Sequence, residues 1–326
     1  MRAITLLLCV SGCLSAATNN GWVDSLGGTM TVDSRGTVTG VSLRGSWVTD
    51  TDLRRLAQYP GLTSIDLSLT HITDEGMSEL KNLRNVTDLN LYYAEYVTDQ
   101  GVAAIKDWKK LKHLNLHGTK SSDTALEHLA GITSLESLDV GSTLMTDVGL
   151  ERLTTLTNLK SLTMGGNELG DAGLQALRQF PTLTFLDLSG RQGTDKNVWT
   201  IVMSTAGLDA VLSLHGLQEL RIGCYAMNIG IEGTKLAEVT ATAVLPAWLE
   251  RMRAHLPQLD TVRFQGCNKI DDASIKTLAA MPKLKEADLR GTGITVKGAA
   301  DLRATKPGVK ISFGPWSGMA ANYRNN

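Results

Sequence analysis

The sequence has few cysteines, few aromatic residues and almost no net charge, and each shortage narrows the classes of protein it can form. Four cysteines in 326 residues are too few for a disulfide framework. Neither CxxC nor CxxH spacing occurs, so we expect no structural zinc site. A formal net charge of -1 creates no long-range field that would recruit nucleic acid or an anionic membrane. With aromatics at only 5%, we expect a core of aliphatic side chains.

Catalytic and phosphate-binding motifs are also missing. Neither GxxxxGK(S/T) nor GxGxxG occurs. The stretch THITDE at 70–75 holds hydroxyls, an imidazole and two carboxylates, an inventory from which a hydrolase could be built. Its Thr-Asp pair, however, returns throughout the chain, whereas an enzyme needs its acid once. We therefore predict no enzymatic activity and no cofactor.

The first seventeen residues have the layout of a secretory signal. Arg2 precedes an apolar run at 3–10, which is far shorter than the ~20 apolar residues of a membrane span. Two processing routes are open. Residues 15–17 (Ser-Ala-Ala) fit cleavage after Ala17, whereas 10–13 (Val-Ser-Gly-Cys) resemble a bacterial lipobox that would lipidate Cys13. Both routes export the mature chain, to the periplasm, to the cell envelope as a lipoprotein, or to the medium.

A pattern of about 24 residues repeats through most of the chain. The segments LKHLNLHGTKSSDTALEHL, LESLDVGSTLMTDVGLERL and LKSLTMGGNELGDAGLQAL begin at 111, 135 and 159. Each repeat reads LxxLxLxxTxITDxGLxxLxxLxx, in which LxLxx alternates like a half-buried strand and GLxxLxxL has helical spacing. The repeats start at Val38, Leu62, Val86, Leu111, Leu135, Leu159, Leu183, Leu217, Leu259 and Leu284.

One such strand-turn-helix unit cannot bury its own apolar face, whereas stacked copies share a continuous core. The matching registers resemble the leucine-rich repeat family. The resemblance implies an α/β horseshoe of about ten repeats, with parallel strands on the concave side and helices on the convex side. The Thr-Asp-x-Gly variant and GCNKIDD around Cys267 are similar to the cysteine-containing-like subclass shared by F-box-associated receptors and bacterial exported repeat proteins. No F-box precedes these repeats, so a ubiquitin-receptor function is not implied.

Two polar columns recur at the start of the predicted helices. Aspartates, mostly preceded by Thr or Ser, occupy one position: Asp50, Asp74, Asp99, Asp123, Asp147, Asp171, Asp195 and Asp272. We expect each carboxylate to cap its own helix, a contribution of about 0.5 to 2 kcal/mol. Glycines follow two residues later, at Gly76, Gly101, Gly149, Gly173 and Gly298. We expect them to leave room for the neighbouring repeat.

The sequence predicts four regions: a signal segment (1–17), an N-terminal cap hairpin (18–37), the repeats (38–308), and a final strand with a tail (309–326). The hairpin should turn at 33–36, with Met30 and Val32 covering the first repeat. At the other end VKISF (309–313) supplies the last strand, which Pro315 stops. Its outer edge is either blocked by the tail or free to pair with another chain in an edge-strand dimer.

The resemblance places specificity on outward-facing strand positions, where two groups stand out. The first group comprises Asp88, Asn90, Tyr92, Tyr93, His113, Asn115, His117 and Asp139. Tyrosine and histidine put amphipathic area on an otherwise small, polar surface, as a binding hot spot requires. The alternative is a solvated ladder of side chains. We predict no metal site, because His113 and His117 are four residues apart on an extended strand and therefore ~13 Å apart.

The second group lies in the last three repeats and comprises Glu219, Arg221, Arg263, Glu286, Asp288 and Arg290. Three arginines beside glutamates suit a carboxylate or an acidic partner surface. Mixed charges on adjacent strands are, however, more often an internal ion-pair ladder.

The seventh and eighth repeats are long, because the starts at 183, 217 and 259 are 34 and 42 residues apart. Pro246 suits a helix start, and Trp248, Leu249, Met252 and Leu256 would form one apolar stripe. We expect an enlarged convex helix layer, with a partner-docking bulge as the alternative. Cys224 and Cys267 occupy nearly the same place in consecutive repeats. A disulfide is within reach, since strands lie ~4.8 Å apart, but a pair of packed thiols is the favoured alternative.

The sequence thus predicts a non-catalytic exported protein that binds a protein partner through its concave surface, centred on Tyr92 and His117. Nucleic acid is not an expected partner. One alternative is an envelope scaffold attached to the membrane only through a lipid on Cys13. A host-directed effector-type repeat protein is another.

Overall fold

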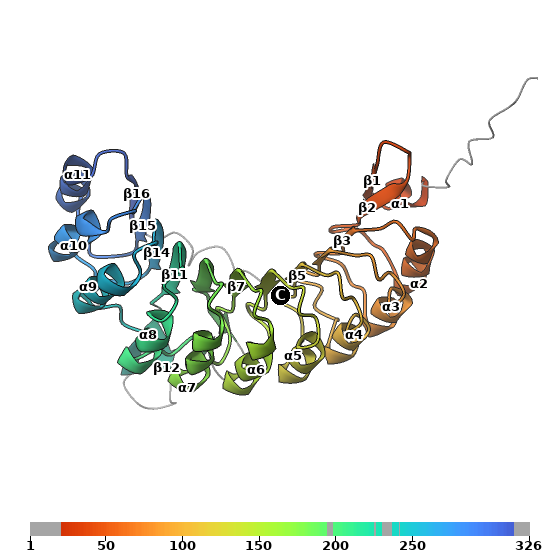
Figure 1. Ribbon diagram of the computed structural model, residues 1–326, viewed down its shortest axis with the longest axis horizontal. Coiled ribbons are helices and arrows are strands. Elements are labelled where there is room, and N and C mark those ends of the chain that lie inside the picture. The colour runs from red at the N-terminus through yellow and green to blue at the C-terminus, as the bar shows by residue number, and fades with distance from the viewer. Residues whose placement is uncertain (1–20, 194–197, 225, 230–236, 241, 316–326) are drawn as a thin grey trace, which may run out of the picture.

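The computed structural model describes residues 21–193, 198–224, 226–229, 237–240 and 242–315. These residues form a curved solenoid in which strands line the concave side and helices form the convex side (Figure 1). The predicted horseshoe fold is therefore confirmed.

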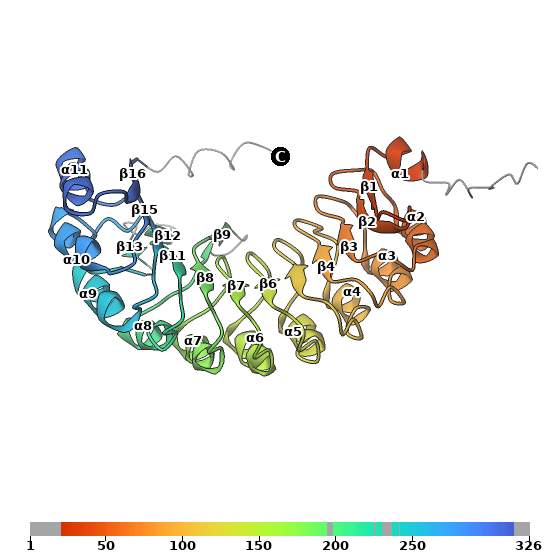
Figure 2. The same cartoon turned by 45° about the horizontal axis from the view of Figure 1, so that its top comes forward.

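One sheet of twelve strands runs along the described part of the solenoid. Neighbouring strands from β2 onward are parallel and follow chain order, so the outward-facing positions of successive repeats lie side by side (Figure 2). Equivalent residues pair, as Asp66 does with Asn90 and Asn115 with Asp139. The strands are β1 (Thr29–Val32), β2 (Val38–Ser42), β3 (Ser64–Asp66), β4 (Asp88–Asn90), β5 (His113–Asn115), β6 (Ser137–Asp139), β7 (Ser161–Thr163), β8 (Phe185–Leu188), β11 (Glu219–Gly223), β14 (Thr261–Gln265), β15 (Glu286–Arg290) and β16 (Lys310–Gly314).

Helix α1 precedes the sheet, and the other helices follow strands on the convex side. The α-helices are α1 (Gly21–Ser25), α2 (Asp50–Leu53), α3 (Asp74–Glu79), α4 (Asp99–Ala103), α5 (Asp123–Leu129), α6 (Asp147–Arg152), α7 (Asp171–Leu174), α8 (Thr205–Val211), α9 (Pro246–His255), α10 (Ile275–Ala280) and α11 (Val296–Thr305). In the described part of the chain, four 3-10 segments extend or precede them: η1 (Arg54–Gln58), η2 (Leu153–Thr155), η3 (Gln175–Gln179) and η4 (Asp272–Ser274).

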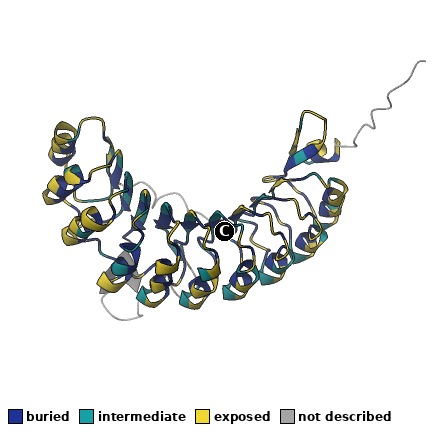
Figure 3. Ribbon diagram, viewed as in Figure 1, coloured by how far each residue is buried: buried dark blue, intermediate teal, exposed yellow. Residues whose placement is uncertain are grey.

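The core is a continuous band between strands and helices, and the outer helix faces are exposed (Figure 3). Repeating leucine positions fill it, so that Leu67, Leu91 and Leu116 are each fully buried. Each repeat thereby shares its apolar face with both neighbours, which a single unit could not do alone.

The aspartate column joins neighbouring repeats, so the expectation that each carboxylate caps its own helix is wrong. Thr73 is the N-cap of α3, and its hydroxyl accepts from the Glu75 amide. Asp74 is already the first helical residue, and its side chain extends sideways to the next repeat. There its carboxylate accepts from the Thr98 amide at 2.8 Å, the Thr98 hydroxyl at 2.6 Å and the Gly101 amide at 2.9 Å.

The same connection recurs along the solenoid. It joins Asp50 to Thr73, Asp99 to Ser122, Asp123 to Thr146, Asp147 to Gly170, Asp171 to Ser204, and Asp272 to Thr295. Asp195 lies outside the described residues, and the helix of its repeat begins at Thr205.

The glycine column accommodates these carboxylates. A Cβ on Gly76 would lie 2.3 Å from an Asp50 oxygen, and one on Gly149 would lie 2.2 Å from an Asp123 oxygen. The prediction that the glycines leave room for the neighbouring repeat is confirmed, and what fills that room is the preceding repeat's aspartate.

The two ends of the sheet differ. At the N-terminal end, Trp22 and Val23 of α1 are buried and Met30 packs against the core, but Val32 is 52% exposed. The prediction for Val32 is wrong: Val32 is the last residue of β1, at the turn end of the hairpin, where an extra residue in β2 shifts the β1–β2 register. At the other end, β16 pairs with β15 and is the last strand among the described residues. Residues 316–326 lie outside the described part, so the edge-strand dimer stays a prediction.

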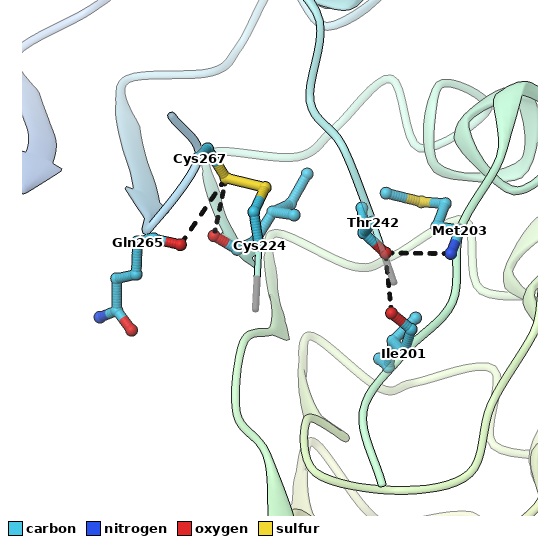
Figure 4. Close-up of a disulfide and its surroundings, with 7 residues drawn as sticks. Ile201, Met203, Cys224, Thr242, Gln265 and Cys267 are labelled. Atoms are coloured by element: carbon cyan, nitrogen blue, oxygen red, sulfur yellow. Dashed lines mark hydrogen bonds between the residues drawn. A yellow bond between two sulfur atoms is a disulfide. The ribbon is translucent and has the colours of Figure 1, made fainter. Parts of the chain in front are cut away.

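The extra length of the two long repeats lies mainly before their helices, which corrects the expected enlargement of the convex layer. Two antiparallel hairpins hold it: β9 (Gln192–Gly193) with β10 (Val198–Trp199), and β12 (Ala226–Ile229) with β13 (Ala237–Thr240). The Thr242 hydroxyl donates to the Ile201 carbonyl at 2.7 Å and accepts from the Met203 amide at 3.0 Å (Figure 4). This buried bond joins the two long repeats. In α9, which begins at Pro246 as predicted, Trp248 and Met252 are buried.

Candidate functional site

Strands β3 to β8 enclose an open depression of about 500 Å³ at the middle of the concave face. Five residues of the first predicted group line it: Asp88, Asn90, His113, Asn115 and Asp139. The remaining three, Tyr92, Tyr93 and His117, follow strands β4 and β5 and form a separate aromatic cluster beside these strands' ends.

The aromatic cluster is closely packed. The Tyr92 ring centroid lies 4.7 Å from that of Tyr93 and 5.2 Å from that of His117. Small residues of the next repeat lie beneath the rings: a Cβ on Gly118 would be 2.9 Å from the Tyr93 ring, and one on Gly141 would be 2.5 Å from His117 Nδ1. All three side chains remain partly accessible. They are therefore fixed in position yet open to a partner, a combination that lowers the entropic cost of binding.

Each histidine on this face pairs with its own carboxylate. His113 Nδ1 lies 2.6 Å from Asp88 Oδ1, and His117 Nδ1 lies 3.2 Å from Asp139 Oδ1. An ionised carboxylate only accepts, so both Nδ1 atoms carry the hydrogen. Among the described residues, no group of three or more His, Cys, Asp or Glu side chains could hold a metal ion.

Three polar residues of the first group have a structural role that the sequence interpretation missed. Asn90 accepts from the Tyr92 amide at 3.1 Å, Asn115 from the His117 amide at 2.9 Å, and Asp139 from the Gly141 amide at 2.9 Å. Each side chain thus closes the turn after its strand, as Asn and Asp commonly do. The recurrence of Asn or Asp at the fifth repeat position was the available signal. Only the second polar atom of each side chain is left for a partner.

An exposed aromatic ladder was also missed. Trp47, 82% exposed, stacks on His71 with ring centroids 5.7 Å apart, and His71 lies 5.8 Å from Tyr96. Trp47, His71 and Tyr96 each directly precede a buried aliphatic residue, namely Val48, Ile72 and Val97, in three successive repeats. The signal in the sequence was an aromatic side chain at the tenth residue of the first two repeats and the eleventh of the third, which is one residue longer.

The second predicted group forms an internal ion-pair ladder. Arg221 Nε lies 2.7 Å from Glu219, and Arg263 reaches Glu219 at 3.1 Å and Glu286 at 2.9 Å across neighbouring strands. Arg290 pairs with Asp288 at 2.5 Å. The arginines are thus paired with carboxylates of their own sheet. This favours an internal ion-pair ladder over a site that binds a partner's carboxylate.

Burial and pairing act in opposite directions on the ladder's buried acids. Burial raises the pKa of Asp187 despite the hydrogen bonds from Ser189 and the nearby Arg221 guanidinium. Burial also opposes ionisation of Asp288, but hydrogen bonds from the Arg290 side chain and amide hold its pKa below the ordinary value. Asp288 is therefore ionised at neutral pH and fixed by Arg290.

Cys224 and Cys267 are joined in a disulfide with an S–S distance of 2.14 Å (Figure 4). The favoured expectation of packed thiols is wrong, because the parallel pairing of β11 with β14 brings the two Cα atoms to 4.8 Å. Cys13 lies outside the described residues, so its lipidation stays a prediction. No helix in the described part of the chain has the length and apolar character to cross a membrane.

A family model described as leucine-rich repeat matches residues 62–81 and 155–177. Together with the solenoid and its repeating core, these matches identify the chain as a leucine-rich repeat protein. The subclass with cysteine-containing-like repeats stays a prediction. No curated protein matches the sequence significantly.

Three solved structures match this chain at low sequence identity. An internalin, inlF, from Listeria monocytogenes is 17% identical, with 91% of this chain and 93% of that chain covered and a TM-score of 0.48. Internalin C2 from the same organism is 20% identical, with 85% and 80% covered and a TM-score of 0.38. The ectodomain of the Arabidopsis receptor kinase HAESA, in complex with an IDA peptide hormone, is 16% identical with a TM-score of 0.51. That match covers 81% of this chain and 40% of the ectodomain.

Proposed function

We propose that this chain is an exported, non-catalytic leucine-rich repeat protein that binds a protein partner through its concave face. The observation that carries the proposal is the aromatic cluster of Tyr92, Tyr93 and His117 beside the open depression. Preordered aromatic side chains on a partly desolvated surface are what interface hot spots contain.

The form of the depression favours an extended polypeptide over a small molecule. It spreads across six strands and is open, whereas small-molecule sites are deep and enclose most of the ligand. The HAESA ectodomain holds a peptide hormone, but the similarity at 16% identity concerns the fold, so this support is analogy.

The cysteine pair supports export. Disulfides persist in oxidising compartments and are rare in the cytoplasm, and Cys224 and Cys267 form one. The secretory signal at residues 1–17 points the same way. The lipid-anchored alternative predicts palmitate labelling that depends on Cys13, whereas release of soluble protein cleaved near Ala17 would count against it.

A site-specific crosslink tests the concave surface. A photoreactive phenylalanine analogue at Ser137, inside the depression, should crosslink the partner in the native organism, and the same analogue at Thr124 on the convex α5 should not. Tyr92→Ala with His117→Ala should reduce the Ser137 crosslink at least tenfold, as expected for hot-spot residues.

The matched control is Glu127→Ala with Arg152→Ala, an ion pair between the convex helices. Its crosslink should equal that of the wild type. An undiminished crosslink in the Tyr92/His117 variant, with the fold intact by circular dichroism, would refute the site.

A further inference from the structure

The eighth position adopts left-handed backbone geometry in nine of the ten repeats, the exception being Cys224 in the eighth repeat. Glycine fills it in six repeats, at Gly45, Gly118, Gly166, Gly190, Gly266 and Gly291. Three repeats depart from this rule: Leu69, Tyr93 and Ser142 have φ values of 57°, 51° and 50°. A side chain at positive φ is strained, and here the bonds between repeats hold the backbone in place: the Leu69 amide donates to the Tyr92 carbonyl and the Tyr93 amide to the His117 carbonyl, each at 2.7 Å. Leu69 and Tyr93 are the two large side chains held this way, and they lie in adjacent repeats.

Both strained side chains line one small cavity of about 230 Å³, which we call the Leu69–Tyr96 niche. Its lining is Leu69, Thr70, His71, Tyr93, Glu95 and Tyr96. The volume is below the roughly 300 to 1,000 Å³ of sites that enclose drug-sized ligands, so it suits a single side chain.

The niche combines aromatic rings with an unpaired carboxylate. Glu95 is exposed, and no Lys or Arg of the described residues forms an ion pair with it. The pKa of the Tyr93 phenol is raised, first by burial and then by the nearby Tyr92 and Glu95, which places negative charge beside the ring. Lys120 Nζ lies 5.4 Å from the centroid of the Tyr96 ring, so this ring already makes a cation–π contact within the chain.

The chain itself shows which side chain such a combination holds. Arg221 lies over the Phe185 ring at 4.7 Å while its Nε meets the Glu219 carboxylate at 2.7 Å. Arg55 lies over the Trp22 ring at 5.0 Å and reaches the Asp52 carboxylate at 3.6 Å. In both places an aromatic ring and a carboxylate together hold a guanidinium group. The Leu69–Tyr96 niche has the ring and the carboxylate but not the arginine.

We propose that the Leu69–Tyr96 niche receives an arginine side chain of the protein partner. The planar guanidinium stacks on aromatic rings and binds carboxylates through paired donors, which an ammonium group does less well. The inference rests on the proposed function, since Tyr93 belongs both to the concave aromatic cluster and to the niche. It adds what the partner must carry, an exposed arginine beside the segment that occupies the depression.

The test uses a small probe, so that it does not depend on finding the partner. N-acetylarginine methylamide is titrated into the 15N-labelled mature chain, and the amide shifts of residues 69–71 and 93–96 are followed by NMR. N-acetylcitrulline methylamide, nearly isosteric but uncharged, is the control probe. We expect saturable shifts with a dissociation constant on the order of 10 mM for the arginine probe and none for the citrulline probe.

Three variants assign the effect to named groups. Glu95→Gln should weaken the arginine probe about fivefold, and Leu69→Gly with Tyr93→Gly about tenfold. Glycine relieves the positive-φ strain, but the double-glycine variant also loses the packing of the Tyr93 ring against Tyr92 and His117. Circular dichroism of the variant therefore separates lost binding from lost folding. Ser142→Gly, the same exchange outside the niche, should leave probe binding unchanged.

The direction in which a fourth variant changes the affinity for the arginine probe tests whether the occupant is a cation. Lys120→Met removes the resident cation and should tighten the arginine probe. Equal binding of the two probes, an unaffected Glu95→Gln variant, weaker binding to Lys120→Met, or no saturable shift would each overturn the proposal. The Ser137 crosslink tests binding at the concave face independently of the niche. If the arginine probe does not bind but the crosslink still forms, the niche proposal is refuted and the proposed function is retained.

Discussion

Replacing Asp123 should weaken the contact between two repeats more than it weakens its own helix. The carboxylate accepts from the Thr146 amide at 2.8 Å and from the Thr146 hydroxyl at 2.6 Å. Hydrogen bonds to charged groups contribute about 1.5 to 3 kcal/mol each, and the half-exposed hydroxyl can be rehydrated after the change. Asp123→Ala should therefore lower the free energy of unfolding by about 3 kcal/mol. Asp123→Asn, which keeps an acceptor for the amide, should cost about 1 kcal/mol.

We call the bond from a helix-start aspartate to the next repeat an aspartate clamp. A double-mutant cycle with Gly149 tests whether the Asp123 carboxylate fills the space beside this glycine. A Cβ on Gly149 would lie 2.2 Å from Asp123 Oδ1, so Gly149→Ala alone should destabilise by about 2 kcal/mol through overpacking. Without the Asp123 side chain that conflict disappears, and only the Leu126 Cδ1 atom, 2.8 Å from the new Cβ, must still move. The better helix propensity of alanine should offset this movement, so the second change should be nearly neutral, within about 0.5 kcal/mol. The interaction energy between the two positions should be about 2 kcal/mol.

Urea unfolding followed by circular dichroism gives the four free energies, and equal m-values show that the same unit unfolds in each variant. Thr124→Ala, on the exposed face of α5, is the neutral control. The chain contains one natural precedent, since Ala125 occupies the glycine position and its amide is 3.2 Å from Asp99 instead of the 2.9 Å between Gly101 and Asp74. Additive effects of the two changes, within about 0.5 kcal/mol, would refute the reasoning.

Two further predictions follow from paired side chains. Hydrogen bonds from Lys160 and Lys112 lower the pKa of Glu136 to about 2, so its stabilisation should be complete above pH 4.5 and lost as the pH falls toward 2. The carboxyl 13C shift of Glu136 should titrate at about pH 2, and an unchanged midpoint after Lys112→Ala with Lys160→Ala would contradict this cause. The disulfide closes 43 residues of chain, which corresponds to about 4 kcal/mol of unfolded-state entropy. Cys224→Ser with Cys267→Ser should lower the melting temperature by several degrees, and dithiothreitol should lower that of the wild type equally. An unchanged melting temperature in both cases would contradict a stabilising role for the disulfide.

The fold could be predicted because its signals are local and repeated. Alternation in LxLxx and helical spacing in GLxxLxxL each predict the conformation of a few residues. Because the pattern occurs ten times, departures in single repeats did not obscure it. The partner of Asp74 could not be predicted in the same way. A helix-start aspartate has the same local signature whether it bonds its own first turn or a threonine 24 residues later, as Asp74 does with Thr98. Only the spacing between stacked repeats distinguishes the two.

The candidate site was predicted in part. Tyrosine and histidine on outward-facing positions were visible in the sequence, and Tyr92 does stack with His117. The turn-closing bond of Asn90 and the positive φ of Leu69 were not predicted from the sequence, because both depend on backbone geometry after the strand. Comparison of the eighth position across repeats held the clue, since most repeats have glycine there.

The aspartate clamps all point in one direction. In each of them the carboxylate belongs to the earlier repeat and the donors belong to the later one, as with Asp147 and Gly170 or Asp272 and Thr295. During synthesis from the N-terminus, the acceptor of each aspartate bond is made before its donors, so we expect each new repeat to dock onto the one before it. We expect assembly on the ribosome to advance one repeat at a time, and a chain shortened from its C-terminal end to retain order better than one shortened from its N-terminal end.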